Sequence, residues 1–238
     1  VVRHCNGSDF WVITSLHNTN HFYTYLVSSS GISGPVISKV GPVDQVGTMH
    51  LKSSPLGDKL ATVMQQEDGV DIEGIIMRNY VTLYDFDNCT GKICENYLCV
   101  NDTSRAPQDN VDQWIGGISF SPDGKLFYLM GSGVGLLQYD LKAADIKASQ
   151  LSISISLGAG SSNPISSGGS SFLDIQIAPD GKLYTGPMAG DTLGVIGRPN
   201  LRGQACISGP TKFALAFGKY CWAGFPNNIS GFTLFPPN

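Results

Sequence analysis

The stretch ISFSPDGKLFYLMGSGVGLLQYDL, residues 118–141, carries the element that decides the fold. Its centre, SPDGKL at 121–126, recurs as APDGKL at 178–183, and a blurred copy, SPLGDKL, lies at 54–60. Because proline presets φ and Asp-Gly tolerates positive φ, each copy predicts a tight turn between two antiparallel strands. The turn residues of the two clear copies are Pro122, Asp123, Gly124, Pro179, Asp180 and Gly181.

Short alternating apolar runs flank these turns and group into four units, at residues 1–46, 47–113, 114–171 and 172–238. Four-stranded units that recur along a chain pack radially as the blades of a β-propeller, whereas the strands of two packed sheets do not recur in this way. We therefore predict an all-β fold: a single β-propeller domain of four-stranded antiparallel blades, with about four blades, complete or part of a larger propeller. Since residues 1–4 already read as a strand, we expect a fragment or a processed start.

Several local predictions follow from the same patterns. The second unit is expected to have strands at 59–64 and 80–86 separated by a polar loop, 65–74. In the third unit, 151–157 is expected to be the outer strand, 142–147 one helical turn, and 158–171 a Gly/Ser-rich loop. In the fourth unit, 214–217 is expected to be a strand, and 229–235 can add one more.

Composition bounds the partners. Only 14% of the 238 residues are charged, against about 25% in typical domains, and the formal net charge is −4. This charge gives no reason to expect nucleic acid or an anionic membrane as partner. No apolar run approaches the length of a membrane span.

Six cysteines favour disulfides and an oxidising compartment over free thiols or a metal. Residues Cys89, Cys94 and Cys99 lack the paired knuckles and nearby histidine of a zinc site, so we predict one disulfide among them and a second between Cys206 and Cys221. Four N-glycosylation triplets begin at Asn6, Asn88, Asn101 and Asn228.

Reactive groups do not form a recognisable constellation. Of the four histidines, His17 and His21 lie on one loop and are most simply solvated or hydrogen-bonded there. No motif of a serine hydrolase, metalloprotease or P-loop is present. Asp85 and Asp87 could bind calcium, but capping a turn is the simpler reading. The acidic set Asp44, Glu67, Asp68, Asp71 and Glu73 is read as a solvated face. We therefore predict no catalytic residue, metal or cofactor.

Aromatic residues on strands are expected to pack in the core. Trp114 and Trp222 lie near turns, where they could form a rim for a sugar or a protein. These two residues are the predicted ligand-binding site.

The chain resembles a group of secreted Bacteroidetes proteins. The resemblance rests on the segments at 2–31, FSPDGKLFY with LLQYDL, IQIAPDGKLYTG, the 198–206 segment and the terminal GFPN. Proteins of that group carry an N-terminal propeller-like region, often followed by adhesive repeats and a sorting domain for type IX secretion of the gliding-motility type. The resemblance implies an extracellular or cell-surface propeller without assigned catalytic residues. This chain differs by lacking the upstream portion and the sorting domain and by its additional cysteines.

Together these features predict a secreted, non-catalytic structural or adhesive propeller that binds protein or glycan through its loops. The alternatives are a propeller hydrolase or lyase acting on polysaccharide, and a subunit of an extracellular filament whose open strand edges form the interface.

Overall fold

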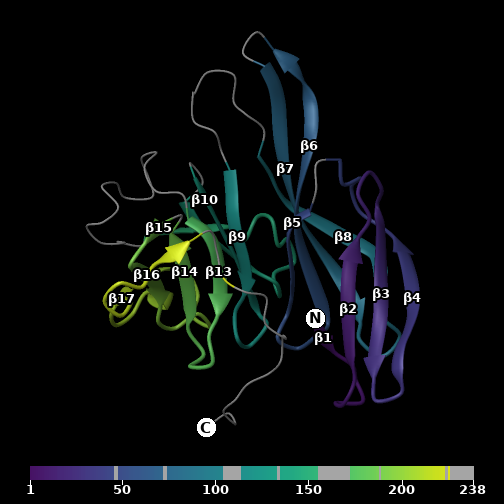
Figure 1. The fold of residues 1–238 in the computed structure, drawn as a ribbon. Helices are drawn as coiled ribbons and strands as arrows, with labels where there is room; N and C mark the ends of the chain where they lie inside the picture. The colour runs from purple at the N-terminus through teal and green to yellow at the C-terminus, as the bar shows by residue number, and fades with distance from the viewer. Residues whose placement is uncertain are drawn as a thin grey trace. The chain divides into compact units, whose positions relative to one another are not determined.

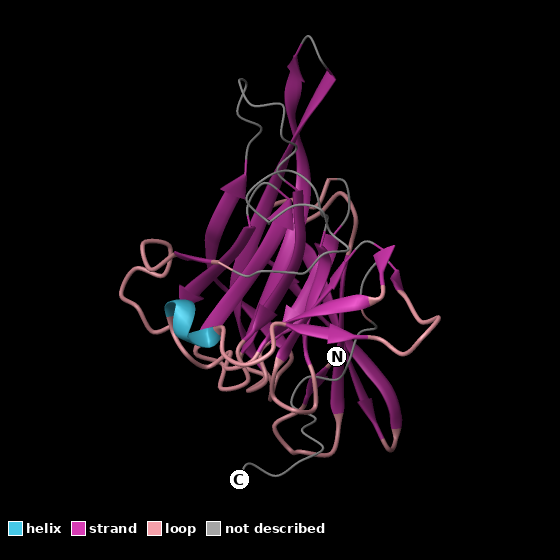
Figure 2. Ribbon diagram, turned by 90° about the vertical axis from the view of Figure 1, so that its left-hand side faces the viewer, coloured by secondary structure: helices cyan, strands magenta, loops and turns pink. Residues whose placement is uncertain are grey.

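The fold is described from a computed structural model, in which residues 1–45, 48–71, 74–103, 114–132, 135–154, 172–187, 189–222 and 225 are described. These residues form four four-stranded antiparallel sheets and a two-stranded pair, with one short helix, η1 (Gly203–Cys206). Figure 2 shows this dominance of strands over helix. The prediction of an all-β fold is confirmed.

Two compact units divide the chain, and each is described by itself. Unit 1 contains the first two sheets, in which the strands follow one another in sequence order (Figure 1). Blade 1 consists of β1 (Val2–Arg3), β2 (Phe10–Ser15), β3 (His21–Ser28) and β4 (Gly31–Lys39). Blade 2 consists of β5 (Thr48–Ser53), β6 (Lys59–Asp71), β7 (Gly74–Asp87) and β8 (Lys92–Thr103).

The core of unit 1 lies between these two blades. Alternation along each strand sends every second side chain to the shared face, where apolar residues exclude water. Phe22 of β3 packs edge-on against Tyr84 of β7, with ring centroids 5.3 Å apart. The buried members of this core are Val2, Trp11, Ile13, Phe22, Val40, Leu60, Met64, Tyr84, Phe86 and Ile93. The two blades are therefore stacked face to face.

Unit 2 repeats the arrangement. Blade 3 consists of β9 (Trp114–Phe120), β10 (Leu126–Ser132), β11 (Gly135–Asp140) and β12 (Leu151–Ile153). Blade 4 consists of β13 (Phe172–Ile177), β14 (Leu183–Pro187), β16 (Thr192–Ile196) and β17 (Lys212–Ala214), and β15 (Ala189–Gly190) pairs separately with β18 (Cys221–Trp222).

The core of unit 2 again lies between its two blades. Its buried members are Leu126, Tyr128, Met130, Leu136, Ile153, Ile175, Leu183, Ile196 and Cys206. The first strands of the two blades approach closely at Gly117 on β9, where a Cβ atom would lie 2.8 Å from the Ile175 nitrogen on β13. Adjacent blades with neighbouring first strands are the arrangement expected around a propeller axis. The chain thus has the four-stranded blade architecture of a β-propeller. Its organisation as one domain stays a prediction.

The recurring corners are tight turns, as predicted, but they differ in detail. In blade 3 the Ser121 hydroxyl accepts the Leu126 N–H at 2.9 Å and donates to Asp123 at 2.6 Å. In blade 4 Ala178 has no hydroxyl, and the first strand pair beyond the turn is Ile177 with Leu183. The corresponding pair in blade 3 is Phe120 with Phe127, so the connection there is one residue longer. The longer connection is the one that contains a hydroxyl group, that of Ser121, at its first position.

Some local predictions are wrong. The polar stretch 65–74 is not a loop: β6 and β7 continue as a paired ribbon as far as Asp71 and Gly74. The segment 142–147 forms turns but no helix, and β12 ends at Ile153. Asp44 is buried, so it does not belong to a solvated face. The loop expected at 158–171 and the strand expected at 229–235 lie outside the described residues.

Candidate functional site

The outer strand of blade 4 is interrupted. Thr192 of β16 pairs with Ala214 of β17, and the Leu215 N–H donates to the Asp191 carbonyl at 2.7 Å. The next pair along the same edge joins Gly190 of β15 to Cys221 of β18. Residues 216–220 therefore leave an otherwise continuous antiparallel ladder, and we call this excursion the aromatic turn. The predicted strand at 214–217 is wrong, because β17 ends at Ala214.

The backbone of the aromatic turn is closed by one hydrogen bond. The Lys219 N–H donates to the Ala216 carbonyl at 2.9 Å. Gly218 at the third position has a φ of +73°, as a type II turn requires, and this is a conformation that glycine adopts without strain. Phe217 thus occupies the corner of the turn.

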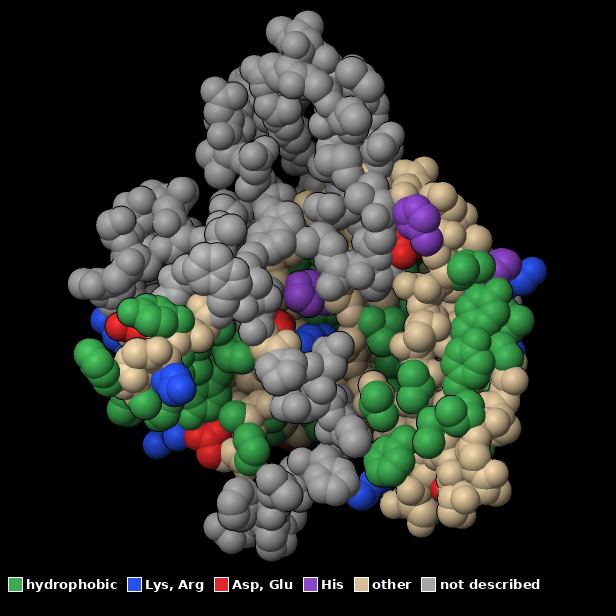
Figure 3. All heavy atoms as spheres, viewed as in Figure 1, with side chains coloured by type: hydrophobic (Ala, Val, Ile, Leu, Met, Phe, Trp, Pro, Cys, Tyr) green, Lys and Arg blue, Asp and Glu red, His purple; other side chains and the backbone are tan. Residues whose placement is uncertain are grey.

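Aromatic side chains of this region point into solvent. Phe217 is fully exposed, and Tyr220 and Phe213 are 70% and 51% exposed. Phe213 packs edge-on against Tyr184 of β14, with centroids 6.0 Å apart. Figure 3 shows exposed hydrophobic side chains over this part of unit 2, at the left of the view. Three exposed rings therefore lie within residues 213–220.

The segment that contains the aromatic turn carries positive charge only. Lys212 and Lys219 are exposed, and no acidic residue occurs between positions 192 and 222. Asp191 precedes β16, whose partner strand leads into the turn, and Asp180 lies at the corner before β14, where it is paired with Lys182 at 3.0 Å. Partial burial raises the pKa of Asp180, but hydrogen bonds from Lys182 and Tyr184 outweigh it and leave the pKa below its ordinary value. The surface therefore combines apolar rings with unneutralised ammonium groups.

Of the two residues of the sequence-based site, only Trp222 adjoins this turn in the chain. Trp222 belongs to β18 and pairs with Ala189, and Trp114 begins β9 and pairs with Ser132. The side chains of both tryptophans lie outside what the structure describes, so their role stays a prediction. Sequence reasoning missed Phe217, although the Phe-Gly-Lys-Tyr run at 217–220 does contain a turn signal.

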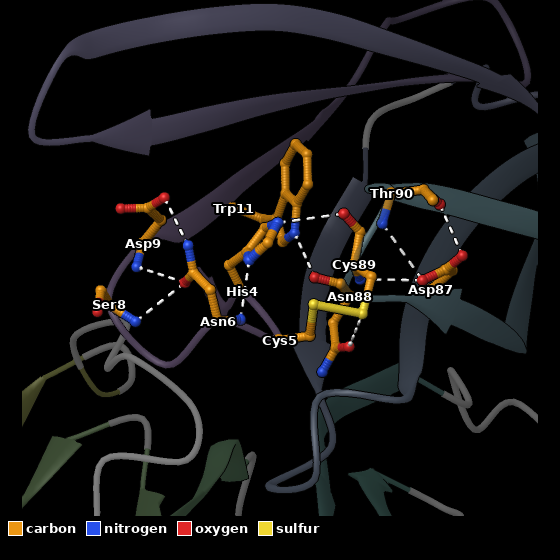
Figure 4. The surroundings of a disulfide bond; sticks show 10 residues. All are labelled: His4, Cys5, Asn6, Ser8, Asp9, Trp11, Asp87, Asn88, Cys89 and Thr90. Carbon is orange, nitrogen blue, oxygen red and sulfur yellow. Dashed lines mark hydrogen bonds between the residues drawn. A yellow bond between two sulfur atoms is a disulfide. The ribbon is translucent and has the colours of Figure 1, made fainter.

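The disulfide lies in unit 1 and joins a pair of cysteines that the sequence did not predict. Cys5, between β1 and β2, is bonded to Cys89, between β7 and β8, with Cα atoms 5.0 Å apart (Figure 4). The predicted pairing of Cys89 with Cys94 or Cys99 is therefore wrong, and Cys94 is a free thiol. The Cys99 side chain lies outside the described residues.

The predicted Cys206–Cys221 disulfide is also wrong. The Cys206 thiol is free and fully buried in the core of unit 2, where it lies beside the Tyr128 hydroxyl. The Cys221 sulfur instead lies near Gly186 of β14. Burial raises the pKa of the Cys206 thiol, so it stays protonated at neutral pH and is not an activated nucleophile.

Polar groups at the disulfide corner hold its loops. The Asn6 N–H donates to Nδ1 of His4 at 3.0 Å, which leaves Nε2 to donate to the Cys89 carbonyl at 3.1 Å. Trp11 Nε1–H donates to the Asn88 carbonyl at 2.8 Å (Figure 4). His4 is thus a hydrogen-bonded residue that follows β1, and not the last residue of the strand expected at 1–4.

Carboxylates singled out in the sequence serve turns and pairs. Asp87 accepts the Thr90 hydroxyl and the N–H groups of Cys89 and Thr90, and the Thr90 hydroxyl is the main reason that the pKa of Asp87 is lowered. Asp85 pairs with Lys59 at 2.7 Å. Asp123 and Asp180 each accept the N–H of the lysine two residues on. The reading of Asp87, Asp123 and Asp180 as turn residues is confirmed.

The remaining marked positions are dispersed. Asn6 is exposed and its amide donates to Asp9 at 2.8 Å, Asn88 is half-buried, and Asn101 lies in β8 paired with Val81. Asn228 lies outside the described residues. Within the described part of the chain, no three metal-ligating side chains come together, and no helix is long and apolar enough to cross a membrane.

Comparisons with known proteins identify no family. No family model and no curated protein matches the chain. A Lactobacillus plantarum protein of known structure is similar over 82% of this chain and 50% of its own, with 15% identity and a TM-score of 0.48. Hsv2 of Kluyveromyces lactis is similar over 75% of this chain and 50% of its own, with 12% identity and a TM-score of 0.39. This chain thus spans half the length of each, and neither likeness carries a function to it.

Proposed function

We propose that this chain is a non-catalytic, extracellular propeller module that adheres to a protein or glycan on a cell surface. The aromatic turn is its contact element. The observation that carries this proposal is the fully exposed Phe217, placed at the corner of an excursion that the outer strand does not need for its pairing. Rigid aromatic rings supply large contact area at small entropic cost, which is why they dominate binding surfaces.

The extracellular assignment is supported by the Cys5–Cys89 disulfide. Both cysteines are exposed, and an exposed disulfide persists in an oxidising compartment but is reduced in the cytosol. The resemblance to secreted Bacteroidetes proteins points to the same location. We therefore propose export through a type IX secretion system as well.

The non-catalytic assignment is supported by the contacts that already occupy the candidate catalytic side chains. His4, Asp85, Asp87, Asp123 and Asp180 are each engaged in a turn or pair, and the Cys206 thiol is buried and protonated. A hydrolase needs two carboxylates placed across a cleft, whereas Asp87, Asp123 and Asp180 accept hydrogen bonds in turns and Asp85 pairs with Lys59. Incubation with a panel of polysaccharides is expected to release no sugar, and release of oligosaccharide would favour the hydrolase or lyase alternative.

The test is adhesion of the fluorescently labelled chain to intact bacterial cells. We expect Phe217→Ala to weaken adhesion about tenfold, since removing a central aromatic anchor costs at least that much at binding surfaces. Leu56→Ala removes another exposed apolar side chain, from unit 1 and at 62% exposure, and is expected to change nothing.

The chemical class of the partner is determined by measuring adhesion to cells that were first treated with protease or with periodate. Loss of adhesion after protease treatment assigns a protein, and loss after periodate oxidation assigns a glycan. Equal adhesion of the wild-type chain and Phe217→Ala contradicts the proposed role of the turn.

A further inference from the structure

Blade 1 has apolar side chains on both of its faces. Trp11, Ile13 and Phe22 belong to the core of unit 1 and are buried. Because side chains alternate along a strand, the residues next to them in sequence lie on the opposite face. That face is formed by three cross-strand pairs: Val12 with Tyr25, Tyr23 with Ile37, and Val27 with Ile32. We call these six side chains the outer face of blade 1.

The outer face is apolar although it is accessible to solvent. Its four residues on β2 and β3 are half-buried, and Ile32 and Ile37 on β4 are 73% and 50% exposed. Figure 3 shows hydrophobic side chains gathered over β2 to β4, at the right of the view. A sheet with one solvated face normally alternates apolar with polar residues, whereas FWVI at 10–13 and FYTYLV at 22–27 are nearly continuous apolar runs. Such runs are typical of sheets that are packed on both faces.

The free edge of blade 1 is poorly suited to pairing with another strand. β4 is the last strand of its sheet, and Pro35 within it has no N–H to donate. The register between β3 and β4 also shifts between Thr24 and Leu26, and a shift of this kind bends a strand. Proline and bulges keep edge strands from joining another sheet. Contact through the outer face is therefore favoured over contact through the edge.

Charge points to a second copy of this chain as the partner. Residues 10–43 contain no acidic residue and one lysine, Lys39, which pairs with His21 at one end of the sheet. Arg3 pairs with Phe10 at the other end, and both cations are exposed. The middle of the outer face is thus uncharged, so two copies can pack there without burying an unpaired ion. The net charge of −4 on 238 residues adds little repulsion between copies.

The size of the outer face determines how tight such a contact is. Three strands, spaced as in any sheet and about six residues long, make a face of roughly 15 by 20 Å. Packing two such faces buries on the order of 1,000 Å² of surface, which is the low end for a specific interface. We therefore expect a weak dimer, with a dissociation constant on the order of 10–100 μM.

We propose that the outer face of blade 1 packs against the same face of a second copy, as the two sheets of a β-sandwich do. The contact is isologous, so it closes in a two-fold dimer and does not grow further. It goes beyond the proposed adhesion and uses other residues, since the aromatic turn lies in unit 2. Because each dimer carries two aromatic turns, adhesion gains avidity wherever both engage.

Sedimentation velocity of the purified chain tests the proposal. We expect the sedimentation coefficient to rise with protein concentration toward the value of a dimer and then to level off. Raising the sodium chloride concentration is expected not to weaken association, because the burial of apolar surface is not screened. A chain that stays monomeric at about 1 mM, well above the expected dissociation constant, overturns the proposal and assigns the face to a different protein.

A charged variant locates the contact. Ile32→Glu places a carboxylate on the outer face at a position that is exposed in the single chain. We expect the dissociation constant to rise about tenfold or more, because both copies then bring a charge into the contact. Phe217→Glu makes the same kind of change at a fully exposed position of unit 2 and is expected to leave association unchanged. Urea midpoints equal to that of the wild-type chain verify that both variants fold, and association that survives Ile32→Glu contradicts the proposal.

A mixture of oppositely charged variants tests the two-fold symmetry. Ile32→Lys alone is expected to weaken association as Ile32→Glu does, and mixing the two chains gives outer faces of opposite charge that associate again. If the mixture stays monomeric, the face does not pack on itself and the two-fold dimer is wrong. Adhesion to cells is a separate measurement: a monomeric chain that still adheres through Phe217 retains the proposed function, and a dimer that adheres equally well with Phe217→Ala loses it.

Discussion

The two blade pairs are fastened in different ways. In unit 1 the turns of adjacent blades are joined at the surface by the Cys5–Cys89 disulfide. In unit 2 the segment 198–206 is fixed to blade 3 by buried hydrogen bonds, which centre on Gln138. The free thiol of Cys206 lies in that core as a small apolar group. One pair therefore depends on the redox state of its surroundings, and the other depends on burial.

The network in unit 2 satisfies backbone groups that would otherwise be buried without partners. The Gln138 amide donates to the Tyr128 hydroxyl at 2.7 Å and to the Leu201 carbonyl at 2.9 Å, and it accepts the Gly203 N–H at 2.7 Å. The Tyr128 hydroxyl in turn donates to the Pro199 carbonyl at 2.7 Å. An irregular segment can lie against a sheet only when its polar backbone is paired in this way.

The largest expected effect comes from breaking the disulfide. Cys5→Ser opens a loop with a sequence separation of 84 residues, and chain entropy alone predicts a loss of about 4 kcal/mol in the stability of unit 1. Urea unfolding followed by Trp11 fluorescence, in a background with Trp114→Phe and Trp222→Phe, measures unit 1 specifically. We expect dithiol reductants to reproduce the loss in the wild-type chain.

The matched control for this variant is Cys94→Ser, which removes a free thiol from β8 and is expected to change the midpoint little. Unit 2, followed by the other two tryptophans in a Trp11→Phe background, should keep its midpoint under reduction. An equal loss of stability in both units would contradict the separate fastening of the two blade pairs.

The next largest effect is expected from Gln138→Leu. The substitution keeps the volume but removes the Gln138 amide as partner of the buried Tyr128 hydroxyl and of the partly buried Gly203 N–H and Leu201 carbonyl, which costs roughly 2 kcal/mol. Unfolding of unit 2 in the Trp11→Phe background measures this loss. Gln66→Leu is the control in unit 1, since the Gln66 amide donates to the Val43 carbonyl at an exposed position; a comparable loss there would show that burial is not the cause.

Local sequence predicts the corners well. The Pro-Asp-Gly copies form turns because proline and glycine restrict or permit particular φ values within a few residues. The blade strands follow from short runs of aromatic and aliphatic residues, as in 10–15 and 126–132. The extra residue at the Ser121 corner depends on one hydroxyl and its partners, which such runs do not encode.

Features that depend on distant residues could not be predicted. The stacking of two blades brings Cys5 next to Cys89, and this contact cannot be predicted from the spacing of the cysteines in the sequence. The paired stretches 65–71 and 74–78 of β6 and β7 continue the ladder by backbone pairing, although the run QQED at 65–68 resembles a polar loop. Phe217 continues an apolar run in the sequence, so the same letters fit a strand or a projecting turn until the pairing of 190 with 221 is known.

A smaller difference between the units should appear at alkaline pH. Burial raises the pKa of the Cys206 thiol above its ordinary value of 9.0, and burial also raises the pKa of Tyr128 well above its ordinary value of 10.0. In the unfolded chain both groups ionise near their ordinary values. The unfolded state of unit 2 therefore binds fewer protons than the folded state once the pH exceeds about 9, and stability falls as the pH rises further.

Below pH 9 this contribution is fully present, so unit 2 should show a flat midpoint at neutral pH and a declining one above it. In unit 1 the two cysteines of the corner are joined and have no thiol proton to lose. Urea midpoints measured from pH 7 to above pH 10 in the Trp11→Phe background test this, and Cys206→Ser should move the onset of the decline toward the ionisation range of tyrosine. An onset that Cys206→Ser leaves in place would mean that the thiol does not contribute, because removing the group with the lower ordinary pKa must remove the earlier part of the decline.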